Sequence, residues 1–190
     1  MKKSLALLLI GVLSLSVLAG CSKPEIKDGG SKPSATDTKK EDKKDDVWTY
    51  FNGTKWSEDF KGLKFEIEKA VVTDKAPAED RSDKLESAVG VKMKITNTTK
   101  EKFTTYPDQA VLVTSTGEQI DMPSIIASDH LGGEIDEGVT KEGAVVWYLK
   151  KAGTAKDIKW VKLKWDARQG AANKFDSESK EFEIKLELKE

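Results

Sequence analysis

Residues 182–189 read Phe-Glu-Ile-Lys-Leu-Glu-Leu-Lys, so that large apolar side chains alternate with charged ones. Successive side chains of a β-strand point to opposite sides, and this pattern therefore predicts a strand with one buried and one wetted face. The same alternation runs through residues 63–68, 89–96 and 161–165. Strands that are apolar on one face only are typical of antiparallel sheets, which the sequence therefore predicts.

Two other stretches are apolar at nearly every position, residues 109–115 (QAVLVTS) and residues 144–149 (AVVWYL). We expect them to be central strands that are covered on both faces. The alternation breaks between Ile67 and Val71 and again between Trp160 and Val161, which predicts a β-bulge in each strand. Residues 80–88 are compatible with one or two turns of helix.

Turn-forming pairs separate the apolar stretches. They are Asn52-Gly53, Lys61-Gly62, Thr116-Gly117, Gly132-Gly133 and Ala152-Gly153. About 7–9 short strands without an internal repeat in residues 47–190 predict an all-β domain, an immunoglobulin-like antiparallel β-sandwich. A small β-barrel is the alternative. The chain has a single cysteine, so an intramolecular disulfide is excluded and the domain depends on packing alone.

The first residues have the pattern of an export signal. Lys2 and Lys3 precede an apolar run over residues 5–17, which is shorter than the roughly 20 residues that a membrane-spanning helix needs. Residues 18–21 are Leu-Ala-Gly-Cys, which resembles the lipobox of bacterial lipoproteins at all four positions. The resemblance implies that residues 1–20 are a signal peptide, cleaved between Gly20 and Cys21. It also implies that Cys21 carries diacylglyceryl, with palmitate-type chains.

Such an anchor would hold the chain outside the cytoplasm, at the cell membrane or, in a bacterium with two membranes, at the outer one. An ordinary secretory signal with a chance cysteine, or a transmembrane helix, is the alternative. Residues 21–46 follow as a flexible charged linker, in which residues 22–46 hold seven acids and seven lysines. A flexible chain of that length spans roughly 28 Å. A short helix beginning at residues 39–46 is the alternative there.

The charge balance argues against a nucleic-acid partner. The formal net charge is −1, whereas phosphate binding relies on an excess of basic residues. The only histidine, His130, follows Ser128 and Asp129, and a catalytic triad is not built from neighbours in the chain. We therefore expect no enzyme activity, no cofactor and no metal. Asp129, Glu134, Asp136 and Glu137 form a loose acidic cluster that leaves calcium binding as an alternative.

Aromatic residues are concentrated in the first part of the predicted domain. Trp48, Tyr50, Phe51, Trp56 and Phe60 lie around the Asn-Gly turn. Trp48, Tyr50 and Trp56 are candidates for a binding platform for a sugar ring or a partner protein, because exposed aromatic rings anchor interfaces. The alternative is that these rings cover the edge of the sandwich as part of its core.

Residues 89–165 contain several short motifs: residues 95–98 (ITNT), Tyr106-Pro107, residues 110–113 (AVLV) and residues 142–147 (EGAVVW). With these motifs the segment resembles a family of exported, mostly lipid-anchored domains of unknown function from Gram-positive bacteria, related to a secreted mycobacterial immunoprotective antigen. One departure is Glu137, where the family often has proline. The resemblance implies an immunoglobulin-like fold and an extracytoplasmic location, but no common reaction.

Two functions follow as hypotheses. The first is a membrane-anchored, non-enzymatic module that binds an envelope protein or a cell-wall component. The second is an accessory or sensor lipoprotein that binds calcium or a saccharide. A hydrolase that uses paired carboxylates is the least favoured alternative.

Overall fold

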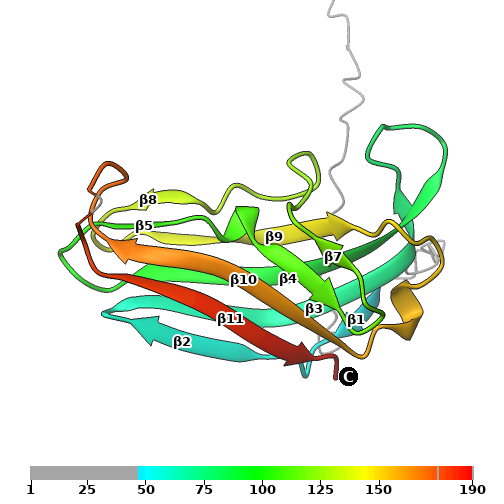
Figure 1. The fold of residues 1–190 in the computed structure, drawn as a ribbon, viewed down its shortest axis with the longest axis horizontal. Coiled ribbons are helices and arrows are strands. Elements are labelled where there is room, and N and C mark those ends of the chain that lie inside the picture. The colour runs from blue at the N-terminus through cyan, green and yellow to red at the C-terminus, as the bar shows by residue number, and fades with distance from the viewer. Residues whose placement is uncertain (1–46, 175, 190) are drawn as a thin grey trace, which may run out of the picture.

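The computed structural model describes residues 47–174 and 176–189, and the predictions for residues 1–46 lie outside the described part of the chain. Eleven strands and two short 3₁₀-helices occur in the described residues (Figure 1). The strands are β1 (Thr49–Phe51), β2 (Trp56–Phe60), β3 (Leu63–Pro77), β4 (Leu85–Asn97), β5 (Phe103–Thr105), β6 (Val111–Thr114), β7 (Gln119–Ile120), β8 (Gly133–Ile135), β9 (Thr140–Tyr148), β10 (Trp160–Gln169) and β11 (Ser179–Glu187). The helices are η1 (Pro107–Gln109) and η2 (Ala155–Asp157).

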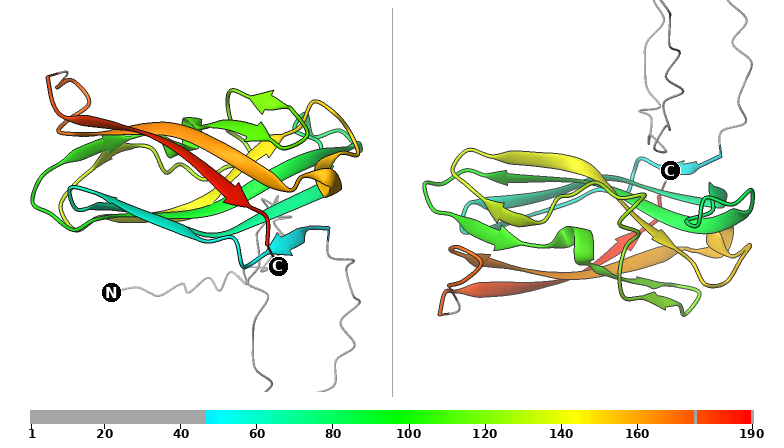
Figure 2. Two further views of the ribbon diagram at one scale, coloured as in Figure 1. Left: turned by 60° about the horizontal axis from the view of Figure 1, so that its bottom comes forward. Right: turned by 90° about the horizontal axis from the view of Figure 1, so that it is seen from above.

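The strands form two antiparallel sheets that pack face to face (Figure 2). The five-stranded sheet, here called sheet A, has the order β1-β3-β4-β9, with β2 also paired to β3. The six-stranded sheet, sheet B, has the order β7-β6-β10-β5-β8, with β11 also paired to β10. The prediction of an all-β antiparallel sandwich is therefore confirmed, although the predicted 7–9 strands are too few, because eleven occur in the described residues. The barrel alternative is wrong, because the two sheets do not close into one.

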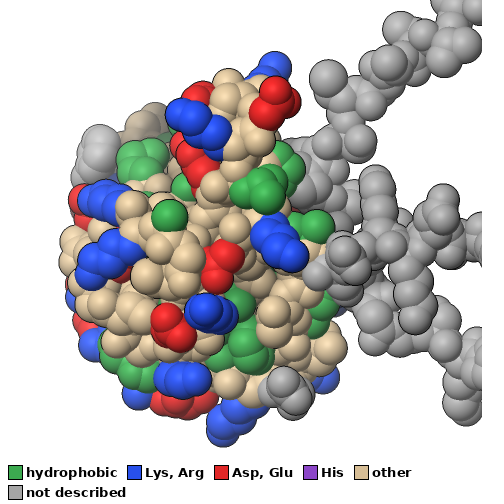
Figure 3. Space-filling model, turned by 90° about the vertical axis from the view of Figure 1, so that its right-hand side faces the viewer, with side chains coloured by type: hydrophobic (Ala, Val, Ile, Leu, Met, Phe, Trp, Pro, Cys, Tyr) green, Lys and Arg blue, Asp and Glu red, His purple; other side chains and the backbone are tan. Residues whose placement is uncertain are grey.

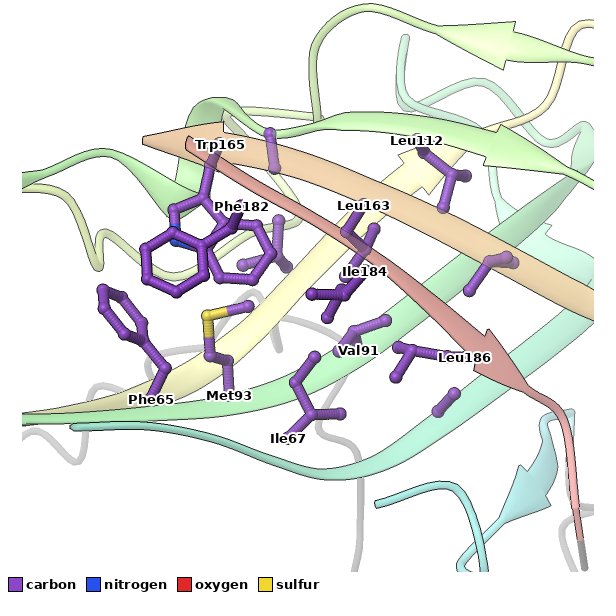
Figure 4. Packing of buried hydrophobic residues seen from close by; sticks show 14 of the residues in the cluster. Phe65, Ile67, Val91, Met93, Leu112, Leu163, Trp165, Phe182, Ile184 and Leu186 are labelled. Carbon is purple, nitrogen blue, oxygen red and sulfur yellow. The ribbon is translucent and has the colours of Figure 1, made fainter. Parts of the chain in front are cut away.

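Aromatic rings from both sheets meet in the core between the layers. Trp165 of β10 and Phe182 of β11 stack with ring centres 4.8 Å apart and planes 7° apart. Phe65 of β3 in sheet A lies 4.9 Å from Phe182 and 5.7 Å from Trp165 (Figure 4). Trp56 of β2 contacts both edge-on, 5.8 Å from Trp165 and 6.2 Å from Phe182. The alternating sequence therefore places its largest apolar side chains where the sheets meet.

One of the two predicted bulges is present. The pairing of β3 with β4 shifts register between Ile67 and Lys69, and this shift exchanges the faces of the residues that follow. The second predicted bulge is wrong, because β10 pairs with β11 without a break from Trp160 onward. Trp160 simply points outward, where the ammonium of Lys185 lies 4.8 Å from its ring centre. The apparent break at that position came from an aromatic residue on the wetted face.

Three further expectations differ from the structure. The apolar stretch in residues 144–149 lies largely in β9, where Val145, Val146 and Trp147 are buried on both faces as predicted, but β9 is an edge strand of sheet A and not a central one. In β6 the interior residues alternate with the half-buried Val111 and Val113, so this strand is not covered on both faces. Residues 80–84 form the turn of the β3–β4 hairpin, and β4 begins at Leu85, so the predicted helical turns are wrong.

The Lys61-Gly62 pair forms the tight turn between β2 and β3. Both residues have positive φ, 54° at Lys61 and 91° at Gly62, as the favoured two-residue hairpin turns require. A Cβ atom on Gly62 would lie 2.3 Å from Cγ2 of Thr99. Glycine is therefore needed there both for the backbone conformation and for the close approach.

We expect Phe182→Ala to lower the free energy of unfolding by about 3–5 kcal/mol, because it leaves a cavity among the stacked rings. Its neighbour Glu183 is exposed on the opposite face of β11, and Glu183→Ala serves as the matched control. We expect that control to change stability by less than about 1 kcal/mol. Urea unfolding of both variants measures the difference, and equal losses would show that the ring cluster does not dominate the core.

Gly62→Ala and Gly117→Ala form a second matched pair. Both glycines have positive φ, but a Cβ on Gly117 would meet nothing within 4 Å. We expect Gly117→Ala to cost about 1–2 kcal/mol from backbone conformation alone. Gly62→Ala should cost at least about 1 kcal/mol more, because it also crowds Thr99. Thermal and urea unfolding would contradict this if the two losses were the same.

Candidate interaction surface

The outer face of sheet A, which points away from sheet B, has a charged half and an apolar half. In the charged half Lys92 pairs with Glu68 at 2.9 Å and with Glu142 at 2.6 Å. Hydrogen bonds to Glu142 and Glu68 raise the pKa of the Lys92 ammonium above its ordinary value. Beyond the β3 bulge, the outward residues include Val71, whose side chain is fully buried. The register shift is thus the boundary between the two halves.

Two of the three predicted platform residues lie on this apolar half. Trp48, at the start of the described chain, and Tyr148 of β9 pack against a cluster on the outer face. The cluster consists of Ala76, Ala88, Ala127 and Val146. Tyr50 pairs with Val71, and the ammonium of Lys69 lies 5.7 Å from the centre of its ring. Trp48 and Tyr50 are two residues apart, so the period of a strand places both on one face, which agrees with this arrangement.

The third predicted platform residue, Trp56, is placed elsewhere. Its ring packs between the sheets against Trp165 and Phe182. Trp56 therefore belongs to the core and does not join Trp48 and Tyr50. The physical reason is the Asn52-Gly53 turn, after which β2 pairs with the front part of β3, where the inward positions are Phe65 and its neighbours.

Tyr148 is held by a hydrogen bond at the edge of the apolar half. Its hydroxyl donates to the carbonyl oxygen of Pro77 at 2.8 Å. Burial, and then the nearby carboxylates of Glu79 and Glu86, raise the pKa of the Tyr148 phenol above its ordinary value. The ring is thus neutral and fixed in position at physiological pH.

Residues 121–129, here called the apolar loop, cover the free edge of β9. The amide of Ser124 donates to the carbonyl of Val146 at 2.8 Å, and the amide of Val146 donates to the hydroxyl of Ser128 at 2.9 Å. The amide of Asp129 donates to the carbonyl of Ala144 at 2.7 Å, and Ala144 donates back to the Asp129 carboxylate at 2.9 Å. The loop therefore forms hydrogen bonds with backbone groups on the free edge of β9, which could otherwise pair with another strand.

Within this ordered loop, three large aliphatic side chains point into solvent. Ile125 is 85% exposed, Met122 54% and Ile126 52%, whereas Ala127 between them and the sheet is buried. At the end of the molecule that lies to the right in Figure 1, basic and acidic side chains are interspersed with separate hydrophobic ones (Figure 3). Several large aliphatics together on one rigid loop mark an interaction site more often than single exposed ones.

The sequence analysis missed this loop, although a signal was present. Residues 121–128 read Asp-Met-Pro-Ser-Ile-Ile-Ala-Ser, which places two adjacent isoleucines in a segment that has no strand alternation. Strands are predicted from alternating apolar residues, and this segment contains too few alternating apolar residues to predict a strand. An apolar pair inside a loop is itself unusual, because loops run over the surface.

Three of the four acidic residues that suggested calcium, Asp129, Glu134 and Asp136, are held by other partners. Lys102 lies between Glu134 at 2.7 Å and Asp136 at 3.1 Å, and its hydrogen bond lowers the pKa of the Glu134 carboxyl. The carboxylate of Asp129, at the end of the apolar loop, accepts a hydrogen bond from the Ala144 amide of β9. Among the described residues, no group of three or more histidine, cysteine or acidic side chains is arranged to hold a metal ion.

His130 pairs with Asp108 of η1, with Nδ1 2.8 Å from the carboxylate, while its own ring is mostly exposed. The other oxygen of Asp108 is buried, and a Cβ on Gly132 would lie 2.2 Å from it. The Ser128 hydroxyl bonds to Val146. Ser128, Asp129 and His130 thus bond to three different partners, Val146, Ala144 and Asp108.

The described residues also include no helix that is long and apolar enough to cross a membrane. Together the fold and this surface define a two-sheet, all-β domain with an apolar loop on one edge. No family model matches the chain. Over 101 residues the chain is 31% identical to the SPbeta prophage-derived uncharacterized lipoprotein YonS of Bacillus subtilis (strain 168), which covers 53% of this chain. The chain spans about half the length of that curated relative, 47%.

Among solved structures, a functionally unknown protein from Listeria monocytogenes EGD-e matches with a TM-score of 0.50 and 17% identity. The match covers 74% of this chain and 86% of that one, and it supports the fold alone. A conserved hypothetical protein from Bacillus anthracis matches with a TM-score of 0.42 and 14% identity over 70% of this chain and 96% of that one, too weakly to carry an argument. The resemblance to the mycobacterial antigen family stays a prediction.

Substitution of the exposed isoleucine and of the buried alanine of the apolar loop should affect stability to different extents. We expect Ile125→Ser to change the free energy of unfolding by less than about 0.5 kcal/mol, because its side chain is solvated. Ala127→Leu should lower it by about 1–3 kcal/mol, because the larger side chain crowds Ala88 and Val146. Urea unfolding measures both, and a large loss with Ile125→Ser would mean that this side chain serves the fold.

Proposed function

We propose that the chain is a bacterial lipoprotein, anchored by lipid on Cys21 at the outer side of a membrane, which presents a non-enzymatic β-sandwich that binds an envelope component. The Leu-Ala-Gly-Cys motif at residues 18–21 supports the anchor. The similarity to a Bacillus lipoprotein over half of the chain supports it independently. Two acyl chains are enough for stable anchoring, since each buried methylene contributes about 0.8 kcal/mol.

The single observation that carries the binding role is the apolar loop. Met122, Ile125 and Ile126 are more than half exposed on a segment that hydrogen bonds fix to β9. Complete burial of a fully exposed side chain of this size contributes roughly 1.5–3 kcal/mol, and these three side chains, which are 52–85% exposed, forgo about half of that or more. The hydrogen bonds that cover the β9 edge do not involve them. A partner that removes these side chains from water would recover that free energy.

The non-enzymatic part of the proposal is supported by the contacts of the residues that could do chemistry. His130 and Asp108 bond to one another, and the Ser128 hydroxyl is engaged by β9. Lys102 neutralises the acidic pair Glu134 and Asp136. These side chains are therefore engaged in hydrogen bonds and ion pairs that stabilise the loops.

We expect Cys21→Ser to move the protein from the membrane fraction to the soluble extracytoplasmic fraction and to abolish incorporation of labelled palmitate. The serine hydroxyl is far less nucleophilic than a thiol, so the acyl glyceryl group is not transferred. Fractionation of cells followed by immunoblotting checks the first outcome, and metabolic labelling checks the second. A variant that stays membrane-bound and labelled would overturn the anchor.

The binding role is tested in cells with a photo-crosslinking amino acid in the full-length chain. One variant carries it in place of Ile125, and the matched control carries it in place of Asp166, which is exposed on the outer face of sheet B. We expect crosslinks to an envelope protein or lipid from position 125 and only background from position 166. Equal background at both positions would overturn the proposed binding surface.

A further inference from the structure

We propose that the partner of the apolar loop is the lipid bilayer itself, into whose interface Met122, Ile125 and Ile126 insert. This inference rests on the proposed function, because it takes the anchor on Cys21 as given. It adds an orientation to the tethered domain: the β9 edge of sheet A, with the apolar loop, faces the membrane.

The loop has the chemistry of an interfacial contact. Its exposed side chains are aliphatic, and the two aromatic rings of the adjoining cluster, Trp48 and Tyr148, are of the kinds enriched where proteins meet the headgroup region. Lys150 and Lys151 are exposed shortly after β9, and the Lys150 amide donates to the carboxylate of Glu118, which directly precedes β7. These basic side chains suit anionic headgroups, whereas Glu79 and Glu86 place negative charge near Tyr148.

The loop is also ordered before it meets a partner. Ser128 donates its amide to the Ser124 carbonyl at 3.0 Å, and the Ala127 amide donates to the Ser124 hydroxyl at 3.1 Å. The backbone of the loop therefore needs no further ordering on insertion. Preorganisation of this kind lowers the entropic cost of docking.

The length and starting point of the chain bring the bilayer within reach. The described chain begins at Val47, next to β1, and Figure 2 shows β1 on the side of sheet A that faces away from sheet B. Trp48 packs against the same outer-face cluster as Ala127 of the loop. Twenty-five residues separate Cys21 from Val47, so a segment of limited length joins the proposed lipid anchor to this end of the domain. Such a link keeps the loop at a high effective concentration near the membrane.

The test uses the mature, lipidated full chain reconstituted into vesicles of phosphatidylethanolamine and phosphatidylglycerol. Cys21 is the only cysteine and is acylated in that protein, so Ile125→Cys supplies a single free thiol for an environment-sensitive fluorophore. Asp166→Cys, on the opposite sheet, is the matched control. We expect spin-labelled lipids to quench the label at position 125 about threefold more than at position 166, because interfacial segments lie about 5–10 Å deep.

Two results would separate this inference from the proposed function. Equal, weak quenching at positions 125 and 166 overturns bilayer contact, and if position 125 still crosslinks to an envelope protein in cells, the proposed function stands. Adding Met122→Ser and Ile126→Ser to the Ile125→Cys chain should remove the excess quenching without changing its melting temperature. Excess quenching that persists in this triple variant would also overturn the inference, because it would assign the contact to other residues.

Discussion

Phe65 on sheet A packs against the stacked rings of Trp165 and Phe182 on sheet B, and the position of every other element depends on this contact. The chain has one cysteine, so no internal disulfide joins the layers, and apolar packing between them must supply the stability. An ion pair between Lys180 of β11 and Glu58 of β2 adds a contact at the margin of the same region. Exposed pairs of this kind contribute little, so the rings hold the two sheets in register.

Because of the bulge in β3, the outer face of sheet A has a charged half and an apolar half. Before the bulge, outward side chains such as Glu66 are exposed and pair with lysines of β4. After it, Ala70 and Val72 face the core, while Lys69 and Val71 take the outward positions. A single inserted residue therefore allows one long strand to bury apolar side chains on both faces at one end. The aromatic residues Trp48 and Tyr148 cover that end.

Alternation along the chain was sufficient to predict the sandwich, because it depends only on the two-residue period of a strand and the need to bury one face. It also predicted the bulge near Ile67, since an inserted residue breaks the period. It could not tell β9 from a central strand, because the cover of its free edge comes from residues 124–129, and their hydrogen bonds are a tertiary feature. Trp56 was assigned to a platform for the same reason: its face is set by pairing with β3, which composition does not encode.

Different atoms of the apolar loop account for two roles, the protection of the β9 edge and the proposed contact with a partner. Its polar atoms, on Ser124, Ser128 and Asp129, occupy the hydrogen-bonding groups of β9 and so remove an edge at which another strand could pair. Serine, alanine or glycine at the positions of Ile125 and Ile126 would leave those bonds in place. A loop that only protected an edge would be expected to expose polar side chains, because exposed aliphatic ones gain nothing from water. Contact of the loop with a binding partner therefore explains the exposed isoleucines better than protection of the β9 edge does.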